Sequence, residues 1–247
     1  MSVEAVAVGE SARGLTGQPI DPLRYDGQYI DKWESTGLIC DMIPAGARLL
    51  DVGCGTGSVS ILIRDATGAT VVGIEPNAAR AETALRRGLE VHLGVLDTTM
   101  AAAVGKFDVV IFADVLEHVP DPILLLEAAK LVLRNGGAVV ISTPNVAHWT
   151  VRWDLFRGRF NYQSRGIMDA THLRWFTRET IEALFTEAGY TVDRYAVAAG
   201  LWMPEYTFRR PWSWMSQGLR EKIVHAGVKR YPALFGCQHV VSASPKA

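Results

Sequence analysis

Short runs of apolar, mostly β-branched residues recur along the chain from Ala47 onward. The segments between them are longer and of mixed polarity. Nearly continuous apolar runs are typical of strands buried on both faces of a sheet, and the intervening segments have the character of helices. This alternation predicts an α/β fold with a mostly parallel sheet and helices on both faces. The runs are ARLLDV (47–52), TVVGIE (70–75), EVHLG (90–94), FDVVIFA (107–113) and GAVVIST (137–143).

Two helices carry clear end signals. Asp121 is a predicted N-cap with Pro122 in the first turn, and Asn135-Gly136 supplies a left-handed stop. Thr177 is a second predicted N-cap, and Gly189 ends that helix. Two more apolar runs are expected to be the last strands, YTVDRYAVA (190–198) and CQHVVSAS (237–244).

Three parts of the chain do not follow the alternation. Residues 1–20 are rich in small residues and are expected to form a disordered leader. Residues 145–176 and 200–235 interrupt the pattern as two insertions, the second rich in Trp, Pro and Arg. No internal repeat is visible, so residues 21–247 are expected to form one domain.

Composition narrows the classes of protein. The formal net charge of -1 gives no general attraction to nucleic acid or to an anionic membrane. Cys40, Cys54 and Cys237 are scattered and form no CxxC pair, which argues against disulfides and structural zinc. A reducing cytoplasm is therefore expected. No apolar run approaches the roughly 18 residues that a membrane-spanning helix needs.

The stretch LLDVGCGTGS (49–58) follows the first predicted strand. Gly53, Gly55 and Gly57 allow a ligand to lie close to the backbone, but Ser58 replaces the third glycine of a dinucleotide turn. Asp51 would face a phosphate unfavourably, whereas it suits a ligand with an ammonium group. S-adenosylmethionine carries an ammonium, a sulfonium and an adenosine, and no phosphate. The loop therefore favours that cofactor.

Acidic residues follow the next predicted strands. Glu75 ends the second strand, where a carboxylate can accept hydrogen bonds from both ribose hydroxyls. Asp97 follows the third strand and is expected to accept from the adenine amino group, although a solvated turn aspartate has the same pattern. Asp114 ends the fourth strand in FADVLEHVPDP (112–122), at the sheet edge where ligands bind.

These motifs resemble class I S-adenosylmethionine-dependent methyltransferases, in the group that includes ubiquinone-type O-methyltransferases and methionine biosynthesis W-type proteins. The resemblance covers about residues 45–195. It implies a Rossmann-like seven-stranded sheet in the order 3-2-1-4-5-7-6, with strand 7 antiparallel. It also implies that Cys54, Pro76 and Tyr29 line the cofactor site, with Tyr29 on a helix that precedes the sheet, and core packing is the alternative role of Tyr29. The matching segments are LLDVGCGTG, GIEP, FDVVIFADVLEHVPDP, LRNGGAVVISTPN and DATHLRWFT…LFTEAGY.

Three histidines fall where the strand ends should converge. Methyl transfer requires a positioned acceptor and, for a hydroxyl, a group that takes its proton. His118, His148 and His172 are the candidate bases, and each has a structural role as its alternative. We expect no metal site, because no pair of these residues has helical ligand spacing.

The first insertion interleaves arginines with aromatic residues. A lid over the acceptor pocket, a packing element and a nucleic-acid surface are the competing interpretations, and nucleic acid is not favoured. The lid interpretation assigns acceptor binding to Arg152, Trp153, Tyr162 and Arg174, with an arginine matching an anionic group. The second insertion could extend the pocket, form a homodimer surface or contact a membrane.

The sequence thus predicts a cytoplasmic methyltransferase that uses S-adenosylmethionine, forms S-adenosylhomocysteine and methylates a small molecule, at oxygen. The alternative from another class is a non-catalytic accessory protein that has this fold and acts through a partner enzyme. A nucleic-acid methyltransferase is a lesser alternative, since ADVLEH (113–118) lacks a base-gripping Asn/Asp-Pro-Pro-Tyr motif.

Overall fold

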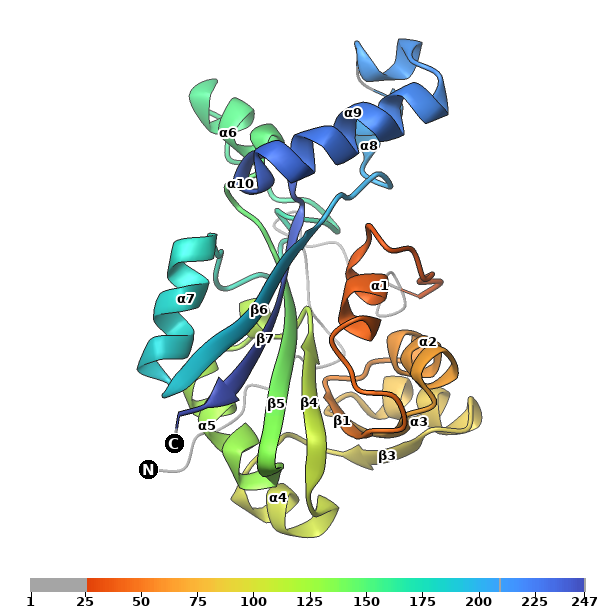
Figure 1. The fold of residues 1–247 in the computed structure, drawn as a ribbon, viewed down its shortest axis with the longest axis vertical. Coiled ribbons are helices and arrows are strands. Elements are labelled where there is room, and N and C mark those ends of the chain that lie inside the picture. Colours follow the sequence, from red (N-terminus) through yellow and green to blue (C-terminus); the bar gives the residue numbers. More distant parts are fainter. Residues whose placement is uncertain (1–25, 209, 247) are drawn as a thin grey trace.

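A single seven-stranded sheet organises the chain in this computed structural model, which describes residues 26–208 and 210–246. The strand order is β3-β2-β1-β4-β5-β7-β6, and Figure 1 labels all of these strands except β2. β7 is antiparallel to both neighbours and the other pairs are parallel, which confirms the expected topology. The leader expected at 1–20 lies outside the described residues. The strands are β1 Arg48–Val52, β2 Thr70–Glu75, β3 Glu90–Leu93, β4 Phe107–Ala113, β5 Leu133–Pro144, β6 Tyr190–Ala198 and β7 Gln238–Pro245.

Helices cover both faces of the sheet (Figure 1). One face packs against α4, α5 and α7 through residues such as Val104, Leu126 and Ile181. The other packs against α1, α2 and α3 through residues such as Ile39 and Ile63. No helix within the described part of the chain is long and apolar enough to cross a bilayer. The helices on the two faces are α1 Ser35–Cys40, α2 Ser58–Thr67, α3 Ala78–Arg86, α4 Thr98–Val104, α5 Pro122–Val132 and α7 Arg178–Glu187.

The predicted helix starts are confirmed and one predicted stop is wrong. Asp121 caps α5 and Thr177 caps α7 through their side chains. However, α5 already ends at Val132, and Asn135-Gly136 lies inside β5 with Gly136 at φ 78°. Buried Leu133 pairs with Phe107 of β4, so sheet pairing begins before the glycine. A register shift between Phe107 and Val109 accommodates the irregular start.

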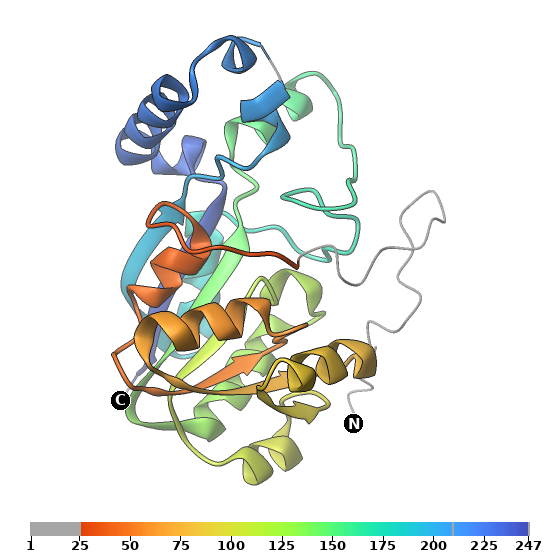
Figure 2. The ribbon, with the colours of Figure 1, turned by 90° about the vertical axis from the view of Figure 1, so that its right-hand side faces the viewer.

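The two insertions pack together beyond one end of the sheet (Figures 1 and 2). The first contains α6, and the second contains four short or medium helices. The largest, α9, was not predicted, because only Val224 and Val228 of it are buried and its apolar pattern is weak. These helices are α6 Trp149–Phe156, α8 Pro204–Phe208, the 3₁₀ turn η2 Trp212–Trp214, α9 Gln217–Arg230 and α10 Pro232–Phe235.

Candidate functional site

A cavity of about 1580 Å³ opens at the carboxyl ends of β1, β2 and β4. Open parallel sheets bind ligands at this edge. The N-terminal segment before α1 and parts of both insertions complete its walls. Tyr29 lies in this segment, but the expected helix around it is wrong, because residues 26–31 have no regular secondary structure and α1 begins only at Ser35. Ten residues singled out from the sequence line it: Tyr29, Gly53, Cys54, Gly55, Glu75, Pro76, Asp97, Asp114, His118 and His172.

The glycine loop between β1 and α2 holds a backbone that only glycine adopts readily. Gly53, Gly55 and Gly57 have φ values of 79°, 58° and 77°. A Cβ on Gly53 would lie 2.8 Å from the Val115 side chain, and one on Gly57 would meet Leu89. In contrast, a Cβ on Gly55 would meet no atom within 4 Å. Gly53 and Gly57 therefore serve packing, whereas Gly55 faces open space in the cavity wall.

Glu75 connects the glycine loop to the start of α3. Its Oε2 accepts a hydrogen bond from the Gly55 amide at 2.8 Å, and its Oε1 accepts from the Asn77 amide at 2.9 Å. The side chain is buried yet lines the cavity. A carboxylate oxygen has more than one acceptor site, so both oxygens retain capacity for ligand hydroxyls.

Asp51 lies beneath the glycine loop rather than among the residues that line the cavity. Its Oδ2 accepts from the Ser60 hydroxyl at 2.6 Å, whereas its buried Oδ1 has no partner. Burial raises the pKa of Asp51 to about 6, although the Ser60 hydrogen bond lowers it and the charge of Glu75 raises it further. A buried, partly unsatisfied carboxylate favours a cationic group or a bridging water nearby.

The remaining cofactor candidates surround the loop. Asp97 caps α4 by accepting a hydrogen bond from the Met100 amide at 2.7 Å. It also lines the cavity, so the same side chain can cap the helix and remains a candidate to bind the adenine amino group. Cys54 is buried, and burial raises the pKa of its thiol, which makes it an unreactive filler of the wall. The open space over Gly55 and the Glu75 carboxylate in the cavity wall fit S-adenosylmethionine, and the unpaired Asp51 oxygen adds a buried negative group beneath the loop.

A polar network lies at the end of β4. Asp114 adopts φ 54° and accepts hydrogen bonds from Ser142 at 3.0 Å and from Gln238 at 2.9 Å. Burial raises the pKa of Asp114 to about 6, although both hydrogen bonds lower it. Gln238 and Ser142 come from β7 and β5, so the central strands hold this carboxylate in place from two sides.

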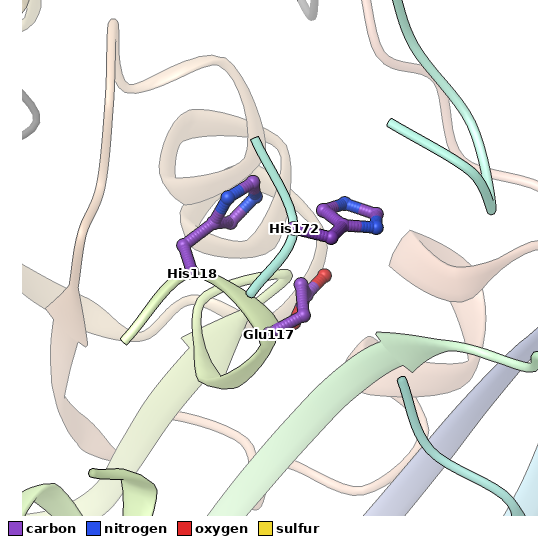
Figure 3. Close-up of side chains that lie close together, drawn as sticks. All are labelled: Glu117, His118 and His172. Atoms are coloured by element: carbon purple, nitrogen blue, oxygen red, sulfur yellow. The ribbon is translucent and has the colours of Figure 1, made fainter. Parts of the chain in front are cut away.

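Two of the predicted histidines meet beside this network, together with Glu117 (Figure 3). The rings of His118 and His172 pack edge to face, with their centroids 4.8 Å apart. Glu117 and His118 belong to the 3₁₀ turn η1 Leu116–His118, and His172 comes from the first insertion. The Glu117 carbonyl accepts from the Leu173 amide at 2.8 Å, which holds the insertion against the turn.

His148 lies in a different place from the other two histidines. It caps α6, is fully buried and does not line the cavity. Its Nδ1 is 2.8 Å from the Thr150 hydroxyl and its Nε2 is 3.3 Å from the Tyr206 hydroxyl. Burial lowers the pKa of His148 to about 3. These contacts give His148 a structural role in joining the two insertions rather than access to a ligand.

The buried neutral state of His148 predicts an acid-sensitive contribution to stability. Its pKa is about 3 in the folded protein and about 6.5 when unfolded, so the unfolded chain gains the proton first as pH falls. Between pH 6.5 and 4.5 this removes roughly 2 kcal/mol of unfolding free energy. His148→Gln should therefore be less stable at pH 7 but lose less stability on acidification. Urea unfolding of both proteins at pH 7, 5.5 and 4.5 measures this, and parallel pH slopes would contradict it.

None of the four acceptor-binding candidates of the first insertion lines the cavity. Arg174 donates to the Pro120 carbonyl and Arg152 donates to the Ala147 carbonyl at 2.6 Å. Trp153 stacks on Phe156, and Tyr162 packs against Phe160 and Trp175. The residues of this insertion that do line the cavity are Arg165, Gly166, Ile167, Thr171 and His172.

Several residues that line the cavity were not identified from the sequence. Glu34, at the start of α1, is buried, and its Oε1 accepts from the Leu201 amide at 3.1 Å. Burial raises the pKa of Glu34 to about 7. Trp202 brings the second insertion into the wall, which supports its role in extending the pocket. The motif ADVLEH carried a signal for Glu117, and the Trp-rich composition of the second insertion carried one for the segment of Trp202 but not for the residue itself. Glu34 was not singled out by any sequence pattern.

Comparisons with known proteins agree with this arrangement. A family model described as a methyltransferase domain matches residues 26–195. The ubiquinone biosynthesis O-methyltransferase of Xanthomonas axonopodis pv. citri is 36% identical over 107 residues, which are 41% of this chain and 45% of that protein. The chain spans about half the length of the curated relatives that it matches.

Solved structures show the same fold at low sequence identity. The methyltransferase in a complex with the Haloferax volcanii Trm112 activator has a TM-score of 0.59 and 19% identity, over 87% of this chain and 90% of its own. Magnesium protoporphyrin IX methyltransferase of Synechocystis, solved with bound S-adenosylhomocysteine, has a TM-score of 0.54 and 16% identity, over 86% and 80%. Since the family model covers more than half of the chain, this protein belongs to the methyltransferase domain family, as a class I S-adenosylmethionine-dependent member.

Proposed function

We propose that the protein transfers a methyl group from S-adenosylmethionine to an oxygen atom of a small-molecule acceptor. The observation that carries this proposal is one continuous cavity. It is lined at one side by Gly55 and Glu75 and at the other by His118 and His172. The cofactor supplies a methyl group that its sulfonium activates, and the protein must place an acceptor against it.

The residues of the chain divide this task between two parts of the cavity. Gly55 leaves room for the cofactor, and Glu75 is placed to accept hydrogen bonds from its ribose. The acceptor oxygen would lie near His118 and His172, where an imidazole Nε2 can take the hydroxyl proton. The new carbon–oxygen bond forms as the carbon–sulfur bond breaks, with the bonding electrons remaining on sulfur. The first insertion would limit the access of water to the acceptor oxygen beside these histidines.

Two further observations support the choice of acceptor and setting. The curated relatives that match about half of this chain are ubiquinone biosynthesis O-methyltransferases, which favours oxygen as the acceptor atom. Exposed Arg165 lines the cavity and would attract an acceptor with a carboxylate or another anionic group. The three cysteines of the described residues are free, in keeping with a reducing, cytoplasmic location.

The test is transfer of a labelled methyl group to a panel of hydroxyl compounds, in pairs that differ by one carboxylate. We expect the labelled methyl group to appear on phenols or sugar-type alcohols, and we expect the anionic member of each pair to have the lower KM. Arg165→Gln should raise the KM of anionic acceptors about 3- to 10-fold and leave that of neutral ones unchanged, because its guanidinium is solvated. Arg159→Gln, on the same insertion but outside the cavity, is the matched control.

A protein that binds S-adenosylhomocysteine but labels no acceptor, and that copurifies with a partner enzyme, would support the accessory interpretation. Labelling of RNA or DNA, with affinity that falls steeply as salt rises, would identify a nucleic-acid substrate instead.

A further inference from the structure

The meeting of Glu117, His118 and His172 brings three metal-ligating groups together inside the cavity. The carboxylate and imidazole atoms that could bind a cation all lie within 4.8 Å of one another. Figure 3 shows the three side chains lying close together, with Glu117 and His118 on the turn after β4 and His172 on a separate segment, which belongs to the first insertion. The sequence predicted no metal site because it contains no helical ligand spacing. Here the fold, rather than the spacing, assembles the ligands.

Both histidine rings are held in the orientation that metal-binding histidines use. The Nδ1 of His118 is 3.2 Å from the Thr171 carbonyl oxygen, and the Nδ1 of His172 is 3.1 Å from the Ile167 carbonyl oxygen. The Thr171 hydroxyl also lies 3.3 Å from the Nδ1 of His118. A carbonyl only accepts hydrogen bonds, so in the tautomer that donates from Nδ1 to these carbonyls each ring has its lone pair on Nε2. Backbone carbonyls fix the rings of metal-bound histidines in this way.

Glu117 provides the independent indication of a missing ligand. Its side chain is 1% exposed and its Oε2 accepts from the Thr143 hydroxyl at 3.0 Å. Its Oε1 is buried and has no hydrogen-bond partner. A buried carboxylate oxygen without a partner is costly, and a cation at this position would satisfy it.

We propose that Glu117, His118 and His172 bind one divalent transition-metal ion, for which zinc is the first candidate. Two imidazoles and one carboxylate form a set that zinc and iron use in catalytic sites, with open positions for other ligands. Ligand atoms on one tetrahedral zinc ion lie about 3.3 Å apart, so binding must draw the three groups closer together. The exposed side of His118 and the cavity leave room for an acceptor oxygen.

The role of the ion in catalysis rests on the proposed function. An acceptor hydroxyl bound to the ion would lose its proton more easily. Because the ion would use both Nε2 lone pairs, the proton would pass to solvent in the metal-bound protein, and a histidine Nε2 would take it only in the metal-free protein. The resulting oxygen anion is the better nucleophile for the methyl group. Binding of the ion itself is independent of methyl transfer and is tested without it.

The experiment titrates Zn²⁺, and separately Mn²⁺, into the tag-free, chelator-treated full chain by calorimetry, with no cofactor present. We expect one saturable site per chain. Glu117→Gln and His172→Gln should each weaken binding at least about 10-fold, because each removes a ligand. Glu90→Gln and His92→Gln change the same residue types in a pair on β3, in which Glu90 is exposed and His92 is half-buried, and should leave the affinity unchanged.

The outcomes separate this inference from the proposed function. Thermal unfolding of each variant establishes that it is folded, and S-adenosylhomocysteine is titrated into the same samples. Two results would overturn the metal proposal alone. One is binding of S-adenosylhomocysteine without binding of a metal ion, and the other is equal metal affinity in the wild type and both ligand variants. Metal binding without S-adenosylhomocysteine binding would leave the ion site standing and remove the proposed methyl transfer.

Discussion

Replacing Glu75 by glutamine should raise the dissociation constant for S-adenosylhomocysteine about 100-fold, which corresponds to about 2.7 kcal/mol. The carboxylate lines the cavity, and hydrogen bonds from ribose hydroxyls to a charged acceptor contribute about 1.5–3 kcal/mol each. Glutamine also turns an N–H donor toward one of the two amide donors, those of Gly55 and Asn77, that the carboxylate now binds. Isothermal titration calorimetry measures the change.

Glu82→Gln is the control for this experiment. Glu82 lies on α3 in an exposed ion pair with Arg86 and does not line the cavity. Its replacement therefore removes the same charge at a distance from the proposed cofactor site. We expect its affinity to match that of the wild type. An unchanged dissociation constant in a folded Glu75→Gln protein would remove Glu75 from the cofactor site.

Gly55→Ala should weaken S-adenosylhomocysteine binding at least about 10-fold. A methyl group at this position meets no protein atom within 4 Å, so it projects into space that the ligand must occupy. The variant should also lose about 1 kcal/mol of stability, because alanine is strained at φ 58°. Calorimetry and urea unfolding measure the two effects separately.

Gly68→Ala separates backbone strain from ligand exclusion. Gly68 ends α2 at φ 69° and a Cβ there also meets no atom within 4 Å, but it does not line the cavity. Gly68→Ala should lose about as much unfolding free energy as Gly55→Ala but keep the wild-type affinity for S-adenosylhomocysteine. Equal affinity losses in the two variants would show that strain, rather than the space over Gly55, explains the effect.

The parts of the fold that were predicted correctly depend on local patterns. Buried strands produce continuous apolar runs, and capping residues such as Asp121 and Thr177 act on the backbone beside them. The glycine loop was located in the same way, because positive φ values demand glycine. The stop at Asn135-Gly136 was misplaced because pairing of Leu133 with β4, a long-range contact, outweighed the local turn signal.

The acceptor side of the cavity could not be predicted as well, because side-chain direction there depends on tertiary packing. Arg152 and Arg165 look alike in sequence, yet Arg152 binds the Ala147 carbonyl while Arg165 reaches the cavity. His118, His148 and His172 likewise cannot be told apart from the sequence, because each follows a predicted strand or precedes a predicted helix at the same edge of the sheet. Only the fold separates His148, buried among Thr150 and Tyr206, from the two histidines that meet at Glu117.

The central claim is that the glycine loop between Asp51 and Glu75 holds S-adenosylmethionine. The most direct measurement titrates S-adenosylhomocysteine and NAD⁺ in parallel into the wild-type protein by calorimetry. The account predicts saturable one-to-one binding of S-adenosylhomocysteine and no binding of NAD⁺, whose pyrophosphate would lie close to two buried carboxyl groups. Binding of NAD⁺ with no heat from S-adenosylhomocysteine would contradict it.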